Sequence, residues 1–95
     1  MPYFIASYAY TGDTDAQQVA RPRHREFLKG LGATLVASGP TDAQGAFLIF
    51  DAASAADVAA LLDADPFQLE GFIGERRIVG WTPVLGRWVE SGLIS

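Results

Sequence analysis

His24, the single histidine of the chain, and Asp65 are the residues best suited to do chemistry. An imidazole can take or give a proton near neutral pH, and a carboxylate can fix its tautomer and stabilise its cation. His24 belongs to an apolar stripe at helical spacing, and a second stripe ends at Asp65. The first stripe continues through Phe27, Leu28 and Leu31, and the second consists of Val58, Leu61 and Leu62. The pair predicts general acid–base chemistry. The alternative is a structural histidine hydrogen-bonded to Asp65, and Asp-Pro is also a common way to leave a helix.

Arg21 and the segment Ser38-Gly39-Pro40 are the candidate substrate-binding residues. Arg21 precedes His24 by three positions, so the two could share a helix face, and a guanidinium matches a carboxylate or phenolate. A surface ion pair is the alternative for Arg21. Ser38 stands before Gly39-Pro40 at an expected strand end, where it could line a pocket or donate a hydrogen bond. A nucleophilic serine is disfavoured, because His24 is the only base on offer.

Composition excludes several classes of function. One histidine and no cysteine give no zinc site, and the glycine spacing matches no dinucleotide or phosphate loop, so no metal and no cofactor are expected. A net charge of −4 disfavours nucleic acid. No apolar run approaches the roughly 20 residues that span a bilayer, so no membrane partner is expected. The N-terminus is typical of a strand rather than a signal peptide, and a cytoplasmic location is the default.

The element order predicts a ferredoxin-like βαββαβ fold in one α+β domain, residues 1–95. Strands are expected over 3–10, 33–38, 46–50 and 71 to about 83, and helices from Pro22 to about 30–32 and from 55 to about 64. Residues 11–20 are expected to be a polar connection, Gly39-Pro40 to end the second strand, and Pro66 to end the second helix. Ser54 with Asp57 forms a capping box. The topology places both helices on one sheet face and runs them antiparallel, which brings His24, in the first turn of one, beside Asp65 after the other.

The second sheet face is apolar as well. The first strand offers apolar or aromatic side chains on both parities, and 46–50 is nearly continuous apolar sequence, as in a strand buried on both faces. Two helices cover one face only, and an open apolar sheet is a liability. We therefore expect a homodimer packed sheet to sheet. Phe67, Tyr8 and Phe47 could wall an aromatic pocket, although core packing is favoured for Phe47.

The chain resembles the YCII-related (YciI-like) family. The resemblance rests on Arg-Pro-x-His-x-x-Phe-Leu at 21–28, Ser38-Gly39-Pro40, Asp65-Pro66-Phe67 followed by Gly71, and Trp81-x-Pro83. It covers roughly residues 3–84 and leaves 85–95 as a C-terminal arm without a motif. It implies a dimeric α+β barrel in which His24 and Asp65 form the pair in a pocket lined by Ser38, Gly39 and Pro40. One branch of the family removes chloride from a chlorinated hydroxyhydroquinone, and nothing assigns this chain to that branch.

We therefore expect a small cofactor-independent enzyme, of isomerase, lyase or dehydrochlorinase type, acting on a small organic molecule, with aromatic and anionic compounds as the candidates. His24 and Asp65 are its catalytic candidates, and Arg21, Ser38, Gly39, Pro40 and Phe67 its substrate-binding candidates. The alternative is a non-catalytic ligand-binding or assembly module with a structural His–Asp pair.

Overall fold

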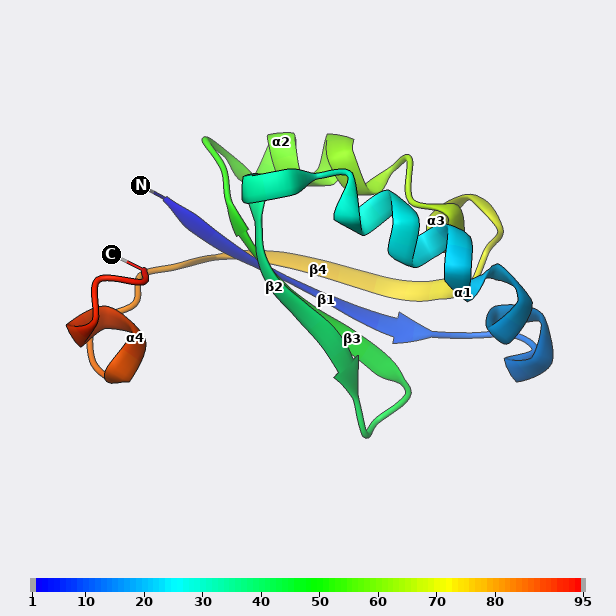
Figure 1. Cartoon of the computed structure of the whole chain (residues 1–95). Coiled ribbons are helices and arrows are strands. Elements are labelled where there is room, and N and C mark those ends of the chain that lie inside the picture. The colour runs from blue at the N-terminus through cyan, green and yellow to red at the C-terminus, as the bar shows by residue number, and fades with distance from the viewer. Residues whose placement is uncertain (1, 95) are drawn as a thin grey trace.

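The computed structural model describes residues 2–94 as a four-stranded antiparallel sheet with helices α1, α2 and α3 on one face (Figure 1). The strands lie in the order β2-β3-β1-β4. The α+β, ferredoxin-like fold class is confirmed. The elements are β1 Tyr3–Tyr10, α1 Thr14–Lys29, the 3₁₀ turn η1 Gly32–Thr34, β2 Leu35–Thr41, β3 Gly45–Asp51, α2 Ala55–Leu62, α3 Pro66–Leu69, β4 Ile73–Trp81 and α4 Arg87–Glu90.

The main core lies between the sheet and the helices. Alternate residues of β1 point to this side, and β3 pairs with them antiparallel, Phe4 opposite Phe50 and Ala6 opposite Leu48. The buried members of this core are Ala6, Tyr8, Leu28, Ala46, Leu48, Phe50, Val58 and Leu62. This layer fixes the position of α1 above the central strands.

Helix α1 begins earlier than the sequence indicates. Residues 11–20 are mostly helical rather than a polar connection, because the Asp13 side chain caps the helix by accepting from the backbone N–H of Asp15 at 2.9 Å. Pro22 therefore lies inside α1 and not in its first turn. His24 is correspondingly in the middle of the helix, where it continues a buried stripe that starts at Gln17.

The strands differ from expectation at β2 and β3. Gly39-Pro40 does not end β2, which pairs on to Thr41, with Pro40 opposite Ala46. Since β2 is an edge strand, a proline there is tolerated. Phe47 was expected in the core but is 45% exposed, because its parity on β3 turns it to the face without α1–α3.

The chain between β3 and β4 forms two helices instead of one. Ser54 caps α2 as expected, accepting from the backbone N–H of Asp57 at 3.1 Å. Helix α2 ends at Leu62, and Pro66 starts α3 as its first residue, a favourable place for proline. Asp65 has the extended backbone expected before a proline, with ψ 128°.

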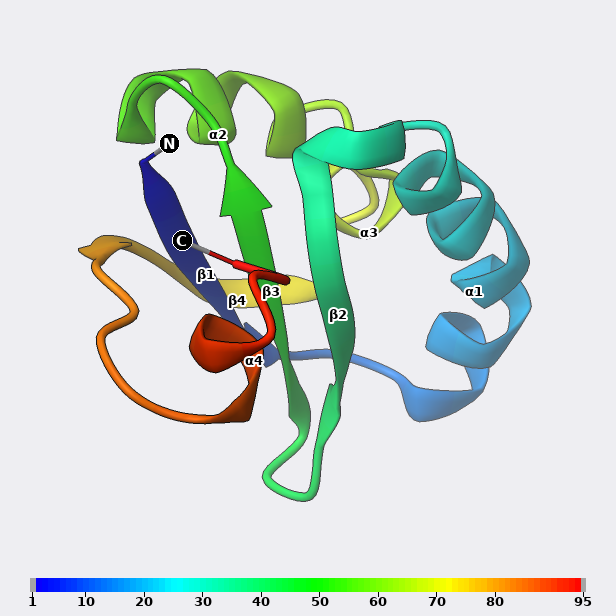
Figure 2. The same cartoon turned by 60° about the vertical axis from the view of Figure 1, so that its left-hand side comes forward.

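The C-terminal arm folds back on the second sheet face, opposite α1–α3 (Figure 2). Ile94 and Val89 pack there against Tyr3, Ile49 and Trp81. The arm covers one end of that face only, and Phe47 and Val79 stay about half exposed. Among the described residues, no helix is long and apolar enough to cross a membrane.

Candidate active site

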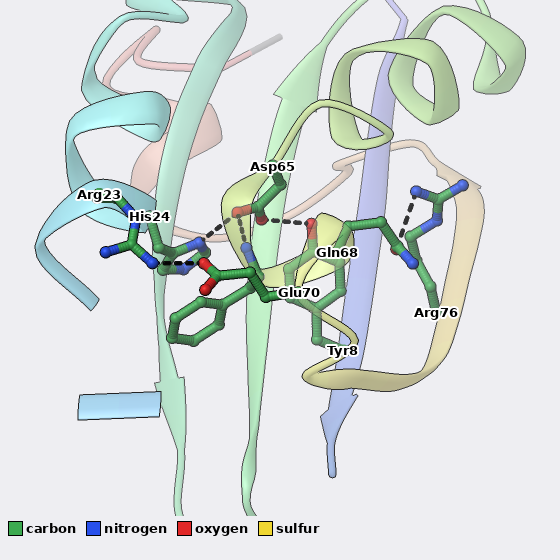
Figure 3. Close-up of polar contacts among 8 residues, drawn as sticks. Tyr8, Arg23, His24, Asp65, Gln68, Glu70 and Arg76 are labelled. Atoms are coloured by element: carbon green, nitrogen blue, oxygen red, sulfur yellow. Dashed lines mark hydrogen bonds and ion pairs between the residues drawn. The ribbon is translucent and has the colours of Figure 1, made fainter. Parts of the chain in front are cut away.

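His24 of α1 and Asp65 meet, as the topology predicts (Figure 3). The imidazole Nδ1 lies 2.7 Å from Asp65 Oδ1, and His24 is 6% exposed. A carboxylate accepts hydrogen bonds, so Nδ1 carries the proton and donates it. The other ring nitrogen, Nε2, makes no hydrogen bond within residues 2–94. In the neutral imidazole this arrangement leaves Nε2 unprotonated, and Nε2 is then the nitrogen that can act as a base.

Asp65 is fully buried and accepts three hydrogen bonds. Besides His24, the backbone N–H of Phe67 donates to Oδ1 at 3.0 Å and the Tyr8 hydroxyl donates to Oδ2 at 2.9 Å. The hydrogen bond from Phe67 is also the N-terminal cap of α3, so the first turn of this helix helps to orient the Asp65 carboxylate. Three donors on two oxygens leave this carboxylate little freedom to rotate.

Sequence analysis named Tyr8 only as a residue that could wall an aromatic pocket, and missed its hydrogen bond to Asp65. Its position on β1 predicts a buried ring, but the hydroxyl contact with Asp65 spans 57 positions of sequence and carries no local signal. Burial and the neighbouring Asp65 carboxylate raise the pKa of Tyr8 well above the ordinary value for tyrosine. The phenol therefore keeps its proton and acts as a permanent donor to Asp65.

Phe67 supports the site from behind. Its buried ring stacks on the imidazole of His24, with centroids 4.1 Å apart and planes within 10°. The same ring meets Tyr10 edge-on at 5.5 Å and lies 5.9 Å from the guanidinium carbon of Arg21. Phe67 was expected in the pocket wall; it instead lies outside the lining and fixes three residues that do line the cavity.

A cavity of about 210 Å³ opens in front of His24, between α1 and strands β2 and β3. It brings together five of the sequence candidates, whereas Asp65 lies behind the imidazole. Its lining is Tyr10, Arg21, His24, Arg25, Leu28, Ser38, Gly39, Pro40, Ala46 and Leu48. The continuation of β2 through Gly39-Pro40 is what carries Ser38 along the cavity edge.

The cavity is basic although the chain is acidic. Arg21 and Arg25 line it, and neither makes an ion pair within the described residues. Arg23, between them, turns away and pairs with Glu70 at 2.6 Å (Figure 3). The surface ion pair considered for Arg21 is thus formed by Arg23 instead. Within residues 2–94, no three potential ligands are grouped to hold a metal.

A second hollow, about 430 Å³, lies between the C-terminal arm and the sheet, and its lining includes Trp81, Trp88 and Ile94. It shares no residue with the cavity at His24. It is larger and more apolar, but no histidine lines it, so the His24–Asp65 pair lies at the smaller cavity.

Comparisons with known proteins concern the family and the fold. A YCII-related domain matches residues 1–82. Among curated proteins no match is found. The structure is similar to 5-chloro-2-hydroxyhydroquinone dehydrochlorinase from Burkholderia phenoliruptrix AC1100, solved with 2,5-dihydroxybenzoquinone, at 25% identity and a TM-score of 0.74 over 86% of this chain and 94% of that one.

Two more distant structures share the fold. An Agrobacterium tumefaciens protein is 21% identical with a TM-score of 0.57, over 88% of this chain and 94% of that one. An antibiotic biosynthesis monooxygenase is 14% identical with the same TM-score, over 90% of this chain and all of that one.

Proposed function

Because the chain belongs to the YCII-related family, we propose that it is a small cofactor-independent enzyme using His24 and Asp65 for general acid–base chemistry on a small molecule. The observation that carries the proposal is the 2.7 Å contact between His24 Nδ1 and Asp65 Oδ1, with the imidazole at the wall of a cavity. The similar dehydrochlorinase acts on a small aromatic compound, which supports the reaction class.

In the proposed mechanism, Nε2 of His24 takes a proton from the substrate, and the imidazolium that forms is stabilised by Asp65. In an isomerisation, the proton then returns to a second atom of the substrate. In an elimination, a leaving group instead departs with its bonding electrons. Tyr8 and the backbone N–H of Phe67 hold Asp65 in place throughout. Proton transfer by a positioned side chain contributes about 10²–10⁴-fold to a rate.

Substrate contacts are proposed for the residues that line the cavity in front of Nε2. Arg21 is the candidate clamp, and Ser38, Gly39 and Pro40 form the β2 wall. Phe67 is assigned a supporting role under the imidazole in place of direct substrate contact.

A homodimer through the second sheet face is also proposed. Phe47 and Val79 remain exposed there at 45% and 47%, beyond the end covered by the C-terminal arm. A second copy packed on this face would remove that apolar surface from water. The cytoplasmic location expected from the sequence stays part of this proposal.

The alternative is a non-catalytic module in which the pair is structural. It is favoured by one observation, that Asp65 caps α3 and holds Tyr8 as well as His24. Loss of stability on replacing Asp65 therefore does not separate the two functions, and the discriminating residue is His24.

The test is chloride release from 5-chloro-2-hydroxyhydroquinone, and deuterium uptake into the ring of 2,5-dihydroxybenzoquinone, by the parent, His24→Gln and Lys29→Gln. Lys29 is an exposed cation of the same helix outside the cavity lining. We expect the rate above background to fall about 10²–10⁴-fold in His24→Gln and to be unchanged in Lys29→Gln. Equal rates in parent and His24→Gln, or no rate above background with either compound, would favour the binding module.

A further inference from the structure

Tyr10 packs with its ring against the main core and also lines the cavity, but the His–Asp pair gives its hydroxyl no role. It ends β1, is half-buried, and lines the cavity beside Arg21 and His24. Its ring is fixed edge-on against Phe67 with centroids 5.5 Å apart. In contrast to Tyr8, its hydroxyl makes no hydrogen bond within residues 2–94. The structure therefore holds the ring in place and leaves the donor free.

Arg21 leaves a second donor unused. Its Nε is buried and has no hydrogen-bond partner among the described residues. Buried polar groups in native proteins are nearly always paired, and this orphaned nitrogen leaves the guanidinium of a cavity-lining residue without an internal acceptor. The neighbouring Arg23 shows that this surface can satisfy an arginine, since it pairs with Glu70.

Neither of the two donors carries a negative charge that would repel an anion. Burial raises the pKa of Tyr10, and the nearby Arg21 opposes this effect without cancelling it, so the phenol stays protonated at neutral pH. A neutral phenol O–H and a guanidinium can both donate hydrogen bonds to the same ligand atom or group. Their common partner is an oxygen that carries negative charge, because charge-assisted hydrogen bonds are the stronger kind.

The cavity volume limits the rest of the ligand. A cavity of roughly 150 Å³ is enough to hold benzene. The cavity here measures about 210 Å³, enough for one ring with small substituents. Part of the remaining wall is apolar, from Leu28, Ala46 and Leu48, and suits the edge or face of such a ring.

We propose that Tyr10 and Arg21 together bind an ionised oxygen, carboxylate or phenolate, of a one-ring substrate, and so select charged over neutral compounds. That the ligand is a substrate rests on the proposed function, whereas the binding itself does not. Tyr10 thereby becomes a specificity-determining residue. Its ring and the imidazole of His24, which would move the proton, both pack against the ring of Phe67.

The test is calorimetric titration of benzoate, and of benzamide as its neutral isostere, into the full chain. We expect benzoate to bind the parent at least tenfold more tightly than benzamide. Tyr10→Phe and Arg21→Gln should each weaken benzoate binding by tenfold or more, as for a hydrogen bond to a charged group. Lys29→Gln, which removes the same charge outside the cavity, should bind like the parent. Tyr10→Phe removes no internal hydrogen bond, and its thermal unfolding checks that it is folded.

Equal benzoate affinity in the parent and Tyr10→Phe would overturn the proposal, as would equal affinity for benzoate and benzamide, or no binding of benzoate at all. Failure of the proposed function has a different signature. In that case benzoate binding still depends on Tyr10 and Arg21, while no rate depends on His24.

Discussion

Replacing Tyr8 by phenylalanine tests how firmly Asp65 is held. The change removes one hydroxyl and its 2.9 Å hydrogen bond to a buried carboxylate, while the ring remains in the core. A hydrogen bond to a charged group contributes about 1.5–3 kcal/mol. We expect Tyr8→Phe to lower the free energy of unfolding at pH 7 by about 2 kcal/mol, a fall in Tm of roughly 8–16 °C for a domain of this size.

The same variant should show a distinct pH dependence. The ordinary pKa of tyrosine is 10.0, and that of Tyr8 is raised in the folded state. The stability due to the protonated phenol is therefore complete below pH 10 and is lost as the unfolded chain ionises above it. By pH 11 the parent loses about 1.4 kcal/mol through this one group, and Tyr8→Phe does not.

Urea unfolding of both proteins at pH 7 and pH 11, at one protein concentration, measures these effects. The gap between parent and Tyr8→Phe should narrow by about 1.4 kcal/mol at the higher pH. Tyr10→Phe is the matched control, since it loses no hydrogen bond and should differ from the parent by less than about 0.5 kcal/mol at pH 7. A gap below 0.5 kcal/mol at pH 7, or one that is the same at both pH values, would refute the described network around Asp65.

Three further changes have expected outcomes. Asp65→Ala should cost about 3–5 kcal/mol in urea unfolding, because buried donors lose their acceptor along with the α3 cap, whereas Asp65→Asn keeps a capping oxygen and should cost about half as much. Pro22→Ala should raise the stability by about 1–3 kcal/mol, since it restores a backbone N–H inside α1, and an unchanged Tm would contradict this. Phe47→Lys should shift the mass in light scattering from dimer to monomer; a monomeric parent would disprove the proposed sheet-to-sheet dimer.

The meeting of His24 and Asp65 could be predicted because it depends on topology. Two helical stripes and a split βαββαβ order place the helices on one sheet face, so that their buried sides lie together. His24 meets Asp65 on this buried side although it lies in the middle of α1 and not, as expected, in its first turn. The boundaries of the elements were less predictable, because the cap at Asp13 and a proline tolerated inside α1 outweigh the usual link between proline and a helix start.

The support around the pair could not be predicted from the sequence. Tyr8 and Asp65 are 57 positions apart, and which oxygen a hydroxyl reaches depends on side-chain packing in three dimensions. The same holds for the Phe67 ring beneath His24 and for the unpaired Nε of Arg21. The fold of the C-terminal arm over one end of the open face likewise depends on contacts with Tyr3 and Ile49, not on a local motif.

The tautomer of His24 tests the central claim most directly. With one histidine in the chain, the ring nitrogens of a ¹⁵N-labelled sample give a single set of NMR signals. In the neutral state we predict a protonated Nδ1 and an unprotonated Nε2 in the parent, and a shift toward protonated Nε2 in Asp65→Asn. A protonated Nε2 in the parent would contradict the assignment of His24 as the base that faces the cavity.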